Sequence, residues 1–500
     1  MHKDDSKTYL NRLSSEGISN LNEGKPKIAL KKFEIILIHR PNHPKILNLI
    51  GLAYYQLKNL NMALEYIMKA IANDSKEIGF YINLGNIYRE LQNYSEAENA
   101  YMRGLKINNN SSELFYNLGI LYTKQHIYKE AIKYYERSLK INPLNKFNLD
   151  NLGNAYKEIA RFDEAIKCHN KAIDLDQNFS QAKFNLSLIM LLTNPTSSAW
   201  GKYEYRSIKN KKIKKLNSFT KWDGSNLKNK SLLIYDEQGI GDAVQFARYI
   251  QLIKKNHTNI VLYIKKNLKF LFCKISKIDK IITNIDNVQK VDFYISIMSL
   301  PYVFRHEKEK PGSYNFFHLN YDLKENWRRK FNKSKKIKIG IMWQGSKIHR
   351  SDHKRSVPLK KMQPLFELDD IEFVSLQKNE GRDQIKLNNY KNLLTDFFCD
   401  NSVDKNPFED TLAIIDNLDL IICVDAHIGH IAATMEKETW IMLSYVPDFR
   451  WGLKGSKTTW YKDVRLFRQK KINLWESVIL EIKNALIEKF FFRYRVIEKS

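Results

Sequence analysis

A 34-residue period is the feature that most constrains the fold of this chain. Glycines recur at that spacing, and an alanine follows each of them twelve positions later. The two series are Gly17, Gly51, Gly85, Gly119, Gly153 and Ala29, Ala63, Ala97, Ala131, Ala165. Small residues let two helices approach closely, while aromatic side chains fill the spaces between them. The pattern therefore predicts stacked helix pairs over residues 1–195.

The repeat resembles the tetratricopeptide repeat, which has Leu-Gly-X-X-Tyr on its first helix and Ala-X-X-X-aromatic on its second. After five copies, the run 181–192 restarts the pattern, and we expect it to form a solvent-capping helix. Such arrays curve around a groove that binds an extended peptide or a neighbouring domain, so we expect a protein partner there. The alternative is a rigid spacer or an oligomerisation module, and the sequence does not separate these roles.

A basic segment, residues 196–230, follows the repeats, and aromatic residues flank its lysine-rich run 209–215. No nucleic-acid-binding fold surrounds this run, so nucleic acid is not an expected partner, and we favour a connector whose aromatic residues dock two modules. The formal net charge is +27, with most of the excess after residue 190. This charge favours anionic partners such as nucleotide phosphates, acidic glycolipid or a membrane surface. A solvated lysine-rich surface is the alternative.

Residues 231–500 alternate apolar, β-rich runs with helical patterns, which indicates parallel sheets covered by helices. A polar break over about residues 305–336 divides them into two Rossmann-like halves, 231–330 and 331–500. Ligands of such sheets bind beyond the carboxyl ends of the strands, so we expect a cleft between the halves. The expected strands are 231–235, 259–264, 280–284, 291–297, 337–343, 371–376, 419–424 and 438–443.

The turn after the first of these strands, residues 236–242, aims backbone N–H groups and one carboxylate into a crevice. Val244 stands where a dinucleotide-binding fingerprint has its third glycine, so a nicotinamide cofactor is not expected. The expected site residues of this turn are Gln238, Gly239 and Gly241, followed by Asp242.

Two strand ends in the second half are also polar. One ends in Gln344-Gly345-Ser346, and the other ends in the run 425–430, which opens a helix and contains two histidines. Helix N-termini bind phosphate, so the two turns together predict a diphosphate-binding site. The histidine pairs in this half have ligand-like spacing but no acidic or cysteine partners, and no metal is expected.

Several segments resemble, in the same order, bacterial proteins that join tetratricopeptide repeats to a glycosyltransferase family 9 body, the ADP-heptose:lipopolysaccharide heptosyltransferase family. They are DEQGIGDAVQFARYI, GIMWQGSKIHRSDHKRSVPL, EFVSLQKNEGRDQI, DLIICVDAHIGHIAATM and PDFRWGLKGSKTTWYKDVRLFRQ, with Trp200–Arg206 in the connector. The resemblance implies an α-solenoid followed by a GT-B fold. It also implies an inverting, metal-independent sugar transfer, with a nucleotide-diphosphate sugar as co-substrate and no cofactor.

The resemblance implies roles for the polar strand ends. Asp242 matches the general base that takes the proton of the acceptor hydroxyl. Arg355 matches a basic residue near the donor diphosphate, and Ala426 stands where the family usually has a hydroxyl that reaches the phosphates. The expected donor-binding residues are Gln344, Gly345, Ser346, Arg355, Gln377, Lys378, Asp425, Ala426 and His430.

Simpler roles remain open for the same residues. Asp242 and Asp425 are suited to capping helix N-termini, since aspartate is favoured there. His430 alternatively packs behind its loop, and Arg355 alternatively is a solvated surface charge.

Together these observations predict a glycosyltransferase that acts on a glycan, glycolipid or protein acceptor, with the repeat array recruiting the acceptor or a partner. The alternative is a non-catalytic interaction protein with a degenerate transferase body, which the alanine at position 426 motivates. The sequence has no apolar run of membrane-spanning length, no signal-peptide pattern at its start, and four scattered cysteines. We therefore expect a cytoplasmic protein, with peripheral contact to an anionic inner membrane as a further option.

Overall fold

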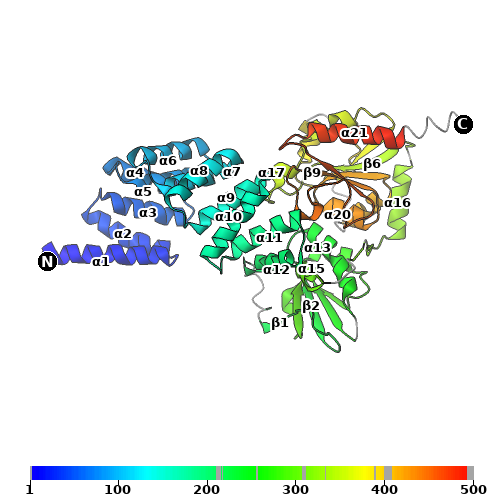
Figure 1. The fold of residues 1–500 in the computed structure, drawn as a ribbon, viewed down its shortest axis with the longest axis horizontal. Coiled ribbons are helices and arrows are strands. Elements are labelled where there is room, and N and C mark those ends of the chain that lie inside the picture. Colours follow the sequence, from blue (N-terminus) through cyan, green and yellow to red (C-terminus); the bar gives the residue numbers. More distant parts are fainter. Residues whose placement is uncertain are drawn as a thin grey trace. The chain divides into compact units, whose positions relative to one another are not determined.

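The computed structural model divides the chain into two compact units, Met1–Asn185 and Leu186–Ser500. The boundary falls inside helix α11 (Ser180–Thr193), which occupies the position of the predicted capping helix (Figure 1). Residues 210–215, most of the predicted lysine-rich run, lie outside the described part of the chain. The described residues are 3–209, 216, 218–254, 257–306, 311–312, 314–332, 334–387, 390–398 and 408–491.

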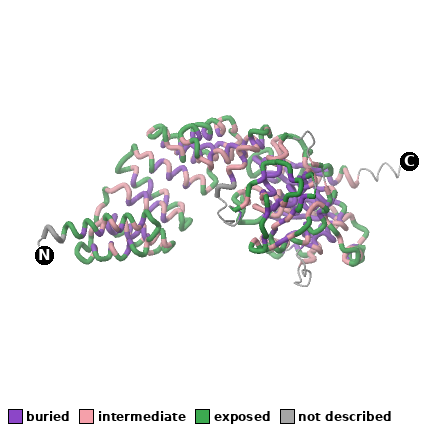
Figure 2. Tube along the Cα trace, turned by 90° about the horizontal axis from the view of Figure 1, so that it is seen from below, coloured by how far each residue is buried: buried purple, intermediate pink, exposed green. Residues whose placement is uncertain are grey.

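The first unit is an array of antiparallel helix pairs, which confirms the predicted helical repeats (Figure 1). Buried residues line the inner faces of the pairs, as the purple segments of Figure 2 show. The helices are α1 (Lys3–Asn22), α2 (Pro26–His39), α3 (Pro44–Gln56), α4 (Leu60–Asn73), α5 (Ile78–Glu90), α6 (Tyr94–Ile107), α7 (Ser112–Lys124), α8 (Tyr128–Ile141), α9 (Lys146–Glu158) and α10 (Phe162–Leu175).

The repeated glycines leave space for one large side chain on the second helix of each pair. These side chains are Phe33, Ile67, Tyr101, Tyr135 and His169. A Cβ atom on Gly85 would lie 2.3 Å from Cε1 of Tyr101, and one on Gly119 would lie 2.4 Å from Cδ1 of Tyr135. Both tyrosine side chains are buried. Since protein interiors are close-packed, a side chain at either glycine would push the paired helices apart. The 34-residue period therefore reports the packing inside each pair.

The turn inside each of these five helix pairs contains a residue in the left-handed region of backbone conformation. In the first pair this residue is a glycine, whereas the later pairs use residues with side chains. Left-handed backbone is unfavourable for residues that carry a Cβ atom. The positions are Gly24, Lys58, Gln92, His126 and Ala160, again 34 residues apart.

We predict that Gln92→Gly raises the free energy of unfolding of the repeat unit by about 1 kcal/mol, because glycine adopts the left-handed conformation without strain. Gln92 is exposed and has a φ of 59°, so the substitution removes little packing. Chemical denaturation followed by circular dichroism measures the change. The control is Gln125→Gly, one residue before the same position in the next repeat, where φ is −84°. Glycine should lower stability there, and equal effects of the two substitutions would contradict the explanation.

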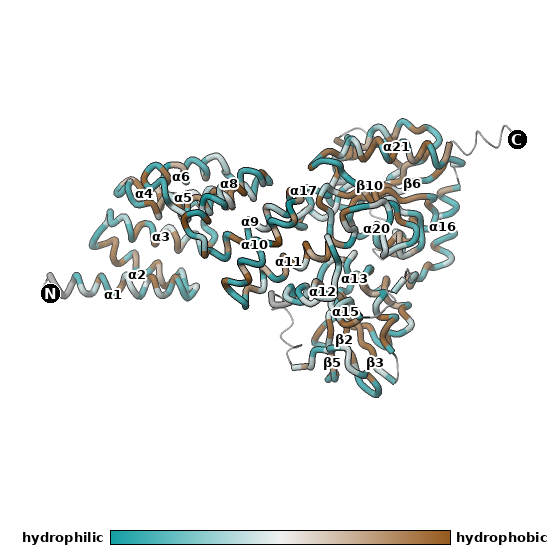
Figure 3. The backbone as a smooth tube through the Cα atoms, viewed as in Figure 1, coloured by the Kyte–Doolittle hydropathy of each residue, from teal (hydrophilic) through white to brown (hydrophobic). Residues whose placement is uncertain are grey.

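The second unit contains two parallel sheets of five strands each, ordered β1-β5-β2-β3-β4 and β10-β9-β8-β6-β7. This confirms the predicted parallel α/β body. Figure 3 shows hydrophobic residues concentrated in the strands. The strands are β1 (Thr220–Lys221), β2 (Ser231–Tyr235), β3 (Asn259–Tyr263), β4 (Lys280–Ile282), β5 (Phe293–Ser296), β6 (Ile337–Met342), β7 (Ile371–Ser375), β8 (Leu420–Val424), β9 (Thr439–Leu443) and β10 (Val464–Arg468).

Helices and short 3₁₀ turns alternate with these strands, as expected for parallel sheets. The α-helices are α12 (Ser197–Tyr203), α13 (Ile240–Ala247), α14 (Lys269–Phe272), α15 (Leu300–Val303), α16 (Tyr321–Phe331), α17 (Asp352–Arg355), α18 (Asp383–Leu387), α19 (Glu409–Asp416), α20 (His427–Thr434) and α21 (Glu476–Phe490). The 3₁₀ turns include η1 (Glu204–Lys209), η3 (Arg248–Leu252), η4 (Lys266–Leu268), η5 (Ile285–Asn287), η6 (Ile297–Ser299), η7 (Leu359–Leu365), η8 (Tyr390–Asn392) and η10 (Phe449–Trp451).

All strands expected from the sequence are present, but β1 and β10 were missed. Strand β1 has only two residues, both exposed, and lies inside the predicted connector, where it pairs with β5. Strand β10 is an edge strand in which Arg465 and Arg468 interrupt the apolar residues, so it lacks the continuous apolar run of a central strand. Residues 197–209 and 220–221 of the predicted connector thus form regular structure within the second unit.

Each sheet has a point at which the direction of winding reverses. In one sheet, β3 and β4 extend to one side of β2, and β5 lies on its other side. In the other sheet, β7 lies on one side of β6, and β8 lies on the other. Ligands of open α/β sheets bind beyond the carboxyl ends of the strands at such switch points. The turns after β2, β6 and β8 are therefore the places where a ligand is expected.

None of the helices in the described part of the chain combines the length and the apolar character that a membrane crossing requires.

Candidate functional site at the strand ends

The turn after β2 opens helix α13 and carries Asp242. The backbone N–H of Gly239 donates to Oδ2 of Asp242 at 2.8 Å, so the carboxylate caps the start of the helix. A Cβ atom on Gly241 would lie 2.7 Å from Cδ2 of His430, which belongs to α20 of the other sheet. The absence of a side chain at Gly241 therefore lets the first turns of α13 and α20 meet.

The second carboxylate oxygen of Asp242 forms an ion pair between the two sheets. Nη2 of Arg450 donates to Oδ1 of Asp242, and Nη1 of Arg450 donates to Oδ1 of Asp448 at 2.6 Å. Asp448 and Arg450 lie after β9, and the side chain of Arg450 is 8% exposed. The sequence analysis did not identify either residue. The available signal was their place in the PDFRWG motif of a segment that carries the family resemblance.

The environment of Arg450 keeps its guanidinium charged. Burial acts to lower the pKa of Arg450, but the carboxylates of Asp448 and Asp242 outweigh burial, and the net shift is upward. The Nε atom of Arg450 is buried and has no hydrogen-bond partner among the described residues. A buried donor of this kind is costly, because water no longer satisfies it.

Arg355 joins the neighbouring ends of β6 and β8. Its Nη1 donates to the backbone oxygen of Asp425 at 3.0 Å. A Cβ atom on Gly345 would lie 2.5 Å from Nη2 of Arg355, so the guanidinium lies against the glycine backbone. The side chain of Arg355 is 16% exposed, unlike a solvated surface charge. Three residues predicted for donor binding therefore meet at the switch point of this sheet.

Asp425 and Ala426 form the start of α20. Burial raises the pKa of Asp425 to about 6, and the nearby Asp448 carboxylate adds to the shift, while Trp451, Arg355 and Arg450 oppose it. Ala426 occupies the N-cap position and provides no side-chain hydrogen bond to the helix. The alanine thus leaves the N-terminus of α20 without the cap that a serine or threonine would supply.

Gln377 holds the end of β6 against the end of β7. Its Oε1 accepts hydrogen bonds from the backbone N–H groups of Trp343 and Gln344, at 3.2 and 3.0 Å. Its Nε2 donates to the backbone oxygens of Gln344 and Glu380, at 3.0 and 2.6 Å. These four bonds use the whole capacity of the amide, so Gln377 acts here as a positioning residue.

The other residues predicted near the end of β6 differ in accessibility. The backbone N–H of Gly345 donates to Oγ of Ser356 at 3.0 Å. Ser346 is exposed at the rim of the site, and its backbone oxygen accepts from His349. Lys378 is partly exposed, with Nζ 4.7 Å from the ring centre of Phe398.

His430 is a buried, neutral imidazole. Its ring stacks on Trp451 with centroids 5.2 Å apart, and its Nδ1 lies 2.9 Å from Oη of Tyr461. Burial, reinforced by Arg450 and Arg248, holds the pKa of His430 well below its usual value. His430 therefore contributes packing and not positive charge, which is the alternative that the sequence left open for it.

Residues of the predicted connector cover the turn after β2. The rings of Trp200 and Phe246 have centroids 6.3 Å apart, and those of Trp200 and Phe449 are 5.9 Å apart. Nε2 of Gln238 donates to Oη of Tyr203 at 3.4 Å. Trp200 thus packs against both α13 and the loop after β9.

A buried ionic cluster occupies the switch point of the first sheet. Nη2 of Arg206 donates to Glu237 at 3.0 Å and to Ser299 at 2.7 Å, and its Nη1 donates to Glu204 at 2.6 Å. Glu237 also accepts from Ser296, the last residue of β5. The sequence analysis assigned no role to Arg206, although the residue lies in the connector segment of the family resemblance.

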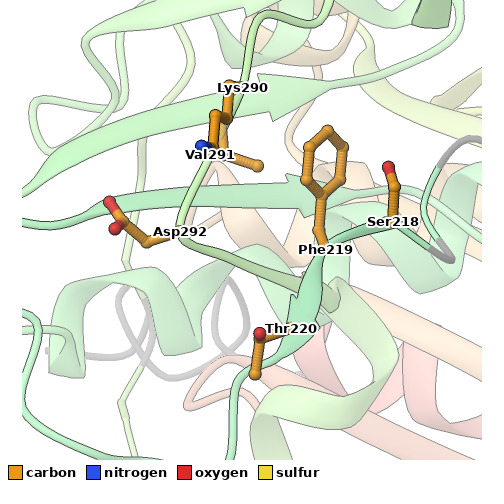
Figure 4. A pocket seen from close by; sticks show the side chains of 6 residues that line it. All are labelled: Ser218, Phe219, Thr220, Lys290, Val291 and Asp292. Atoms are coloured by element: carbon orange, nitrogen blue, oxygen red, sulfur yellow. The ribbon is translucent and has the colours of Figure 1, made fainter.

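A surface pocket lies away from these groups, at the opposite edge of the first sheet (Figure 4). Its lining residues lie at the amino ends of β1 and β5, where Thr220 begins β1 and the others precede the two strands. They are Ser218, Phe219, Thr220, Lys290, Val291 and Asp292. Over the described ranges, no group of three or more His, Cys, Asp or Glu side chains is arranged to hold a metal ion.

Fold and site together define the class of this chain: a tetratricopeptide-repeat array joined to a parallel α/β body. Family models described as tetratricopeptide repeat match residues 44–77, 112–145 and 149–179, and one described as TPR repeat matches residues 85–126. Protein FlbA of Caulobacter vibrioides is 20% identical to this chain over 335 residues. The match spans 62% of this chain and 55% of FlbA, so just over half of that relative is covered.

Solved structures also match part of the chain, and one of them is described as a TPR protein. A crystal structure of MamA is 25% identical and matches 32% of this chain and 94% of its own, with a TM-score of 0.29. A thermophilic TPR protein of Thermus thermophilus is 20% identical and matches 37% and 100%, with a TM-score of 0.33. PilF of Pseudomonas aeruginosa is 15% identical and matches 41% and 95%, with a TM-score of 0.37.

We predict that Gly241→Ala lowers the free energy of unfolding of the second unit by about 1–3 kcal/mol, because the added methyl group overlaps the buried ring of His430. Differential scanning calorimetry measures the loss. Gly312→Ala is the matched control, since nothing lies within 4 Å of a Cβ atom there. If Gly241→Ala proved as stable as the control, the proposed tight contact between α13 and α20 would be wrong.

We also predict that the stability of the second unit falls as the pH rises through about 6. Burial raises the pKa of Asp425 from 3.8 to about 6, so the folded state favours the protonated carboxyl. Its stabilising contribution is full below the unfolded pKa and is lost as the pH rises through the folded pKa. Unfolding free energies between pH 4 and 8 test this, and Asp425→Asn should flatten the dependence over that interval. An unchanged slope in the variant would contradict the assignment.

Proposed function

We propose that this protein is a glycosyltransferase that moves a sugar from a nucleotide-diphosphate donor to a glycan, glycolipid or protein acceptor. The observation that carries the proposal is the ion pair between the Asp242 carboxylate and Arg450, together with the guanidinium of Arg355, which like Arg450 lies near Asp425. Transfer from a diphosphate donor needs a base for the acceptor hydroxyl and positive charge for the leaving group. These three side chains supply both.

The finer proposal is the GT-B architecture and the glycosyltransferase family 9 chemistry that the sequence resembles. In its support, the body has two parallel sheets, each with a switch point. The proposed base, Asp242, follows β2 in one sheet, and the proposed donor-binding residues follow β6 and β8 in the other. The positively charged surface expected from the composition suits an anionic donor.

In the proposed reaction, the acceptor oxygen attacks the anomeric carbon of the donor sugar. A carbon–oxygen bond forms there as the bond to the diphosphate oxygen breaks, and the hydroxyl proton passes to Asp242. Gly239 and Arg450 each occupy one acceptor position on different oxygens of Asp242, so each oxygen retains another lone pair. The nucleoside diphosphate leaves with the bonding electrons, and Arg355 and Arg450 offset its charge.

Tetratricopeptide repeats indicate protein–protein interaction. We propose that the array recruits a protein acceptor, or a partner that delivers the acceptor, to the α/β body. Peripheral contact with an anionic membrane would bring a glycolipid acceptor to the same body through its net positive charge.

A second candidate function is a non-catalytic interaction protein that keeps the transferase fold. Two observations favour it. Ala426 provides no hydroxyl at the start of α20, and both oxygens of Asp242 already accept hydrogen bonds from the protein. In this alternative the α/β body is a structural support for the repeat array, and the Asp242–Arg450 ion pair only stabilises the fold.

We predict that the intact chain binds at least one nucleotide sugar and that Asp242→Asn retains binding while transfer falls by at least about a hundredfold, as expected for loss of a general base. A thermal-shift screen of nucleotide sugars identifies the donor, because a ligand that binds only the folded state raises the melting temperature. Release of nucleoside diphosphate in the presence of candidate acceptors then measures transfer.

The matched control is Asp369→Asn, which removes the same charge from an exposed residue just before β7, at the amino edge of the sheet. This variant should bind and transfer as the unchanged protein does. Failure of every donor to bind would favour the non-catalytic alternative, and full transfer by Asp242→Asn would reject the assignment of the base.

A further inference from the structure

We infer that Arg450 binds the diphosphate of the donor and that this binding releases Asp242 from its ion pair, so that Oδ1 of the proposed base loses its guanidinium partner when the donor is in place. The inference rests on the proposed function. It adds Arg450 as a donor-binding residue, and it makes the use of the acceptor depend on prior binding of the donor. Arg450 lies outside the motif residues to which the family resemblance assigns roles.

The position of Arg450 is fixed by aromatic residues and by acids. Its guanidinium carbon lies 4.6 Å from the ring centre of Phe449 and 5.4 Å from that of Phe246. Its two terminal nitrogens donate to Asp242 and to Asp448. Rings from η10 itself and from α13 thus lie close to the guanidinium, while its terminal nitrogens face carboxylates. An arginine fixed in this way recognises planar or multidentate anions through paired hydrogen bonds.

The hydrogen bonds of Arg450 within the protein are incomplete. Its side chain is more than nine-tenths buried, and its Nε has no hydrogen-bond partner in the described part of the chain. The Nε of Arg355 also lacks a hydrogen bond there, but it lies 3.6 Å from Oδ1 of Asp352 in an ion pair. Unsatisfied buried donors are uncommon in folded proteins, and an anion with several oxygens would satisfy the Nε of Arg450. This donor therefore points to a multidentate anion as the missing partner.

A diphosphate competes well with Asp242 for Arg450. It offers more negative charge and more acceptor oxygens than one carboxylate. Arg355 and the uncapped start of α20 would also attract the diphosphate, since both lie beside Asp425, which is close to Asp448 and Arg450. Asp448 remains available to hold Nη1 when Nη2 changes partner. The exchange therefore requires only that one of the two ion pairs of Arg450 open.

Release changes the surroundings of Asp242. Once the diphosphate holds Arg450, Asp242 retains only the hydrogen bond from Gly239 to Oδ2, and both lone pairs of Oδ1 are open to the acceptor hydroxyl. The exchange orders the substrates, because the guanidinium of Arg450 lies against Oδ1 until the donor has bound.

The test measures binding of ADP, GDP and UDP to the intact chain by isothermal titration calorimetry, without acceptor. In Asp242→Asn the carboxylate no longer competes for Arg450, so the best of these ligands should bind about tenfold tighter than to the unchanged protein. Arg450→Lys retains the charge but loses the paired donors, and it should bind roughly tenfold more weakly. The control Asp369→Asn, with the same change in net charge, should match the unchanged protein.

The outcomes separate this inference from the proposed function. If a diphosphate binds the unchanged protein and Asp242→Asn with equal affinity, the competition for Arg450 is overturned and the proposed transferase stands. If neither protein binds any of the three diphosphates, both proposals fail. Tighter binding by Asp242→Asn cannot arise from misfolding, since misfolding weakens binding. A purely structural ion pair predicts weaker or unchanged binding when the pair is removed.

Discussion

The close approach of α13 and α20 at Gly241 is the contact on which the candidate site depends. Each helix starts at the carboxyl end of a strand, and the two strands belong to different sheets. Because Gly241 has no side chain, the ring of His430 fits against its backbone, and the next residue, Asp242, comes within hydrogen-bonding distance of Arg450. A bulkier residue at Gly241 would separate the proposed base from the positive charge. The chemistry of the site thus follows from steric complementarity between two helix starts.

The regular parts of this fold were predictable because they repeat or because they are buried. The spacing of Gly85 and Gly119 reflects a packing contact with an aromatic ring in the same repeat, so the information lies within one 34-residue period. Central strands such as β8 are buried along their whole length and stand out as apolar runs. Strands β1 and β10 lie at sheet edges, where exposure mixes charged with apolar residues, and the same reasoning missed them.

The site was predictable only in part. Parallel strands place their carboxyl ends at one edge, so the sequence indicated that Gly345, Arg355 and Asp425 would converge, and the structure brings them together. It did not indicate the partner of Asp242, because Arg450 lies 208 residues away and that pairing depends on how two helices pack. Local sequence indicates which residues cap helices and where strands end. Tertiary packing determines which arginine forms the buried ion pair with Asp242.

The ionic cluster around Arg206 distinguishes the two sheets at their switch points. In the first sheet, Arg206 and Lys221 pair with Glu204 and Glu237, so two positive and two negative side chains balance one another. The corresponding point of the second sheet presents Arg355 beside the uncapped start of α20. The short segment before β1, which supplies Glu204 and Arg206, thus makes two sheets of similar architecture unequal in how the charges at their strand ends are paired.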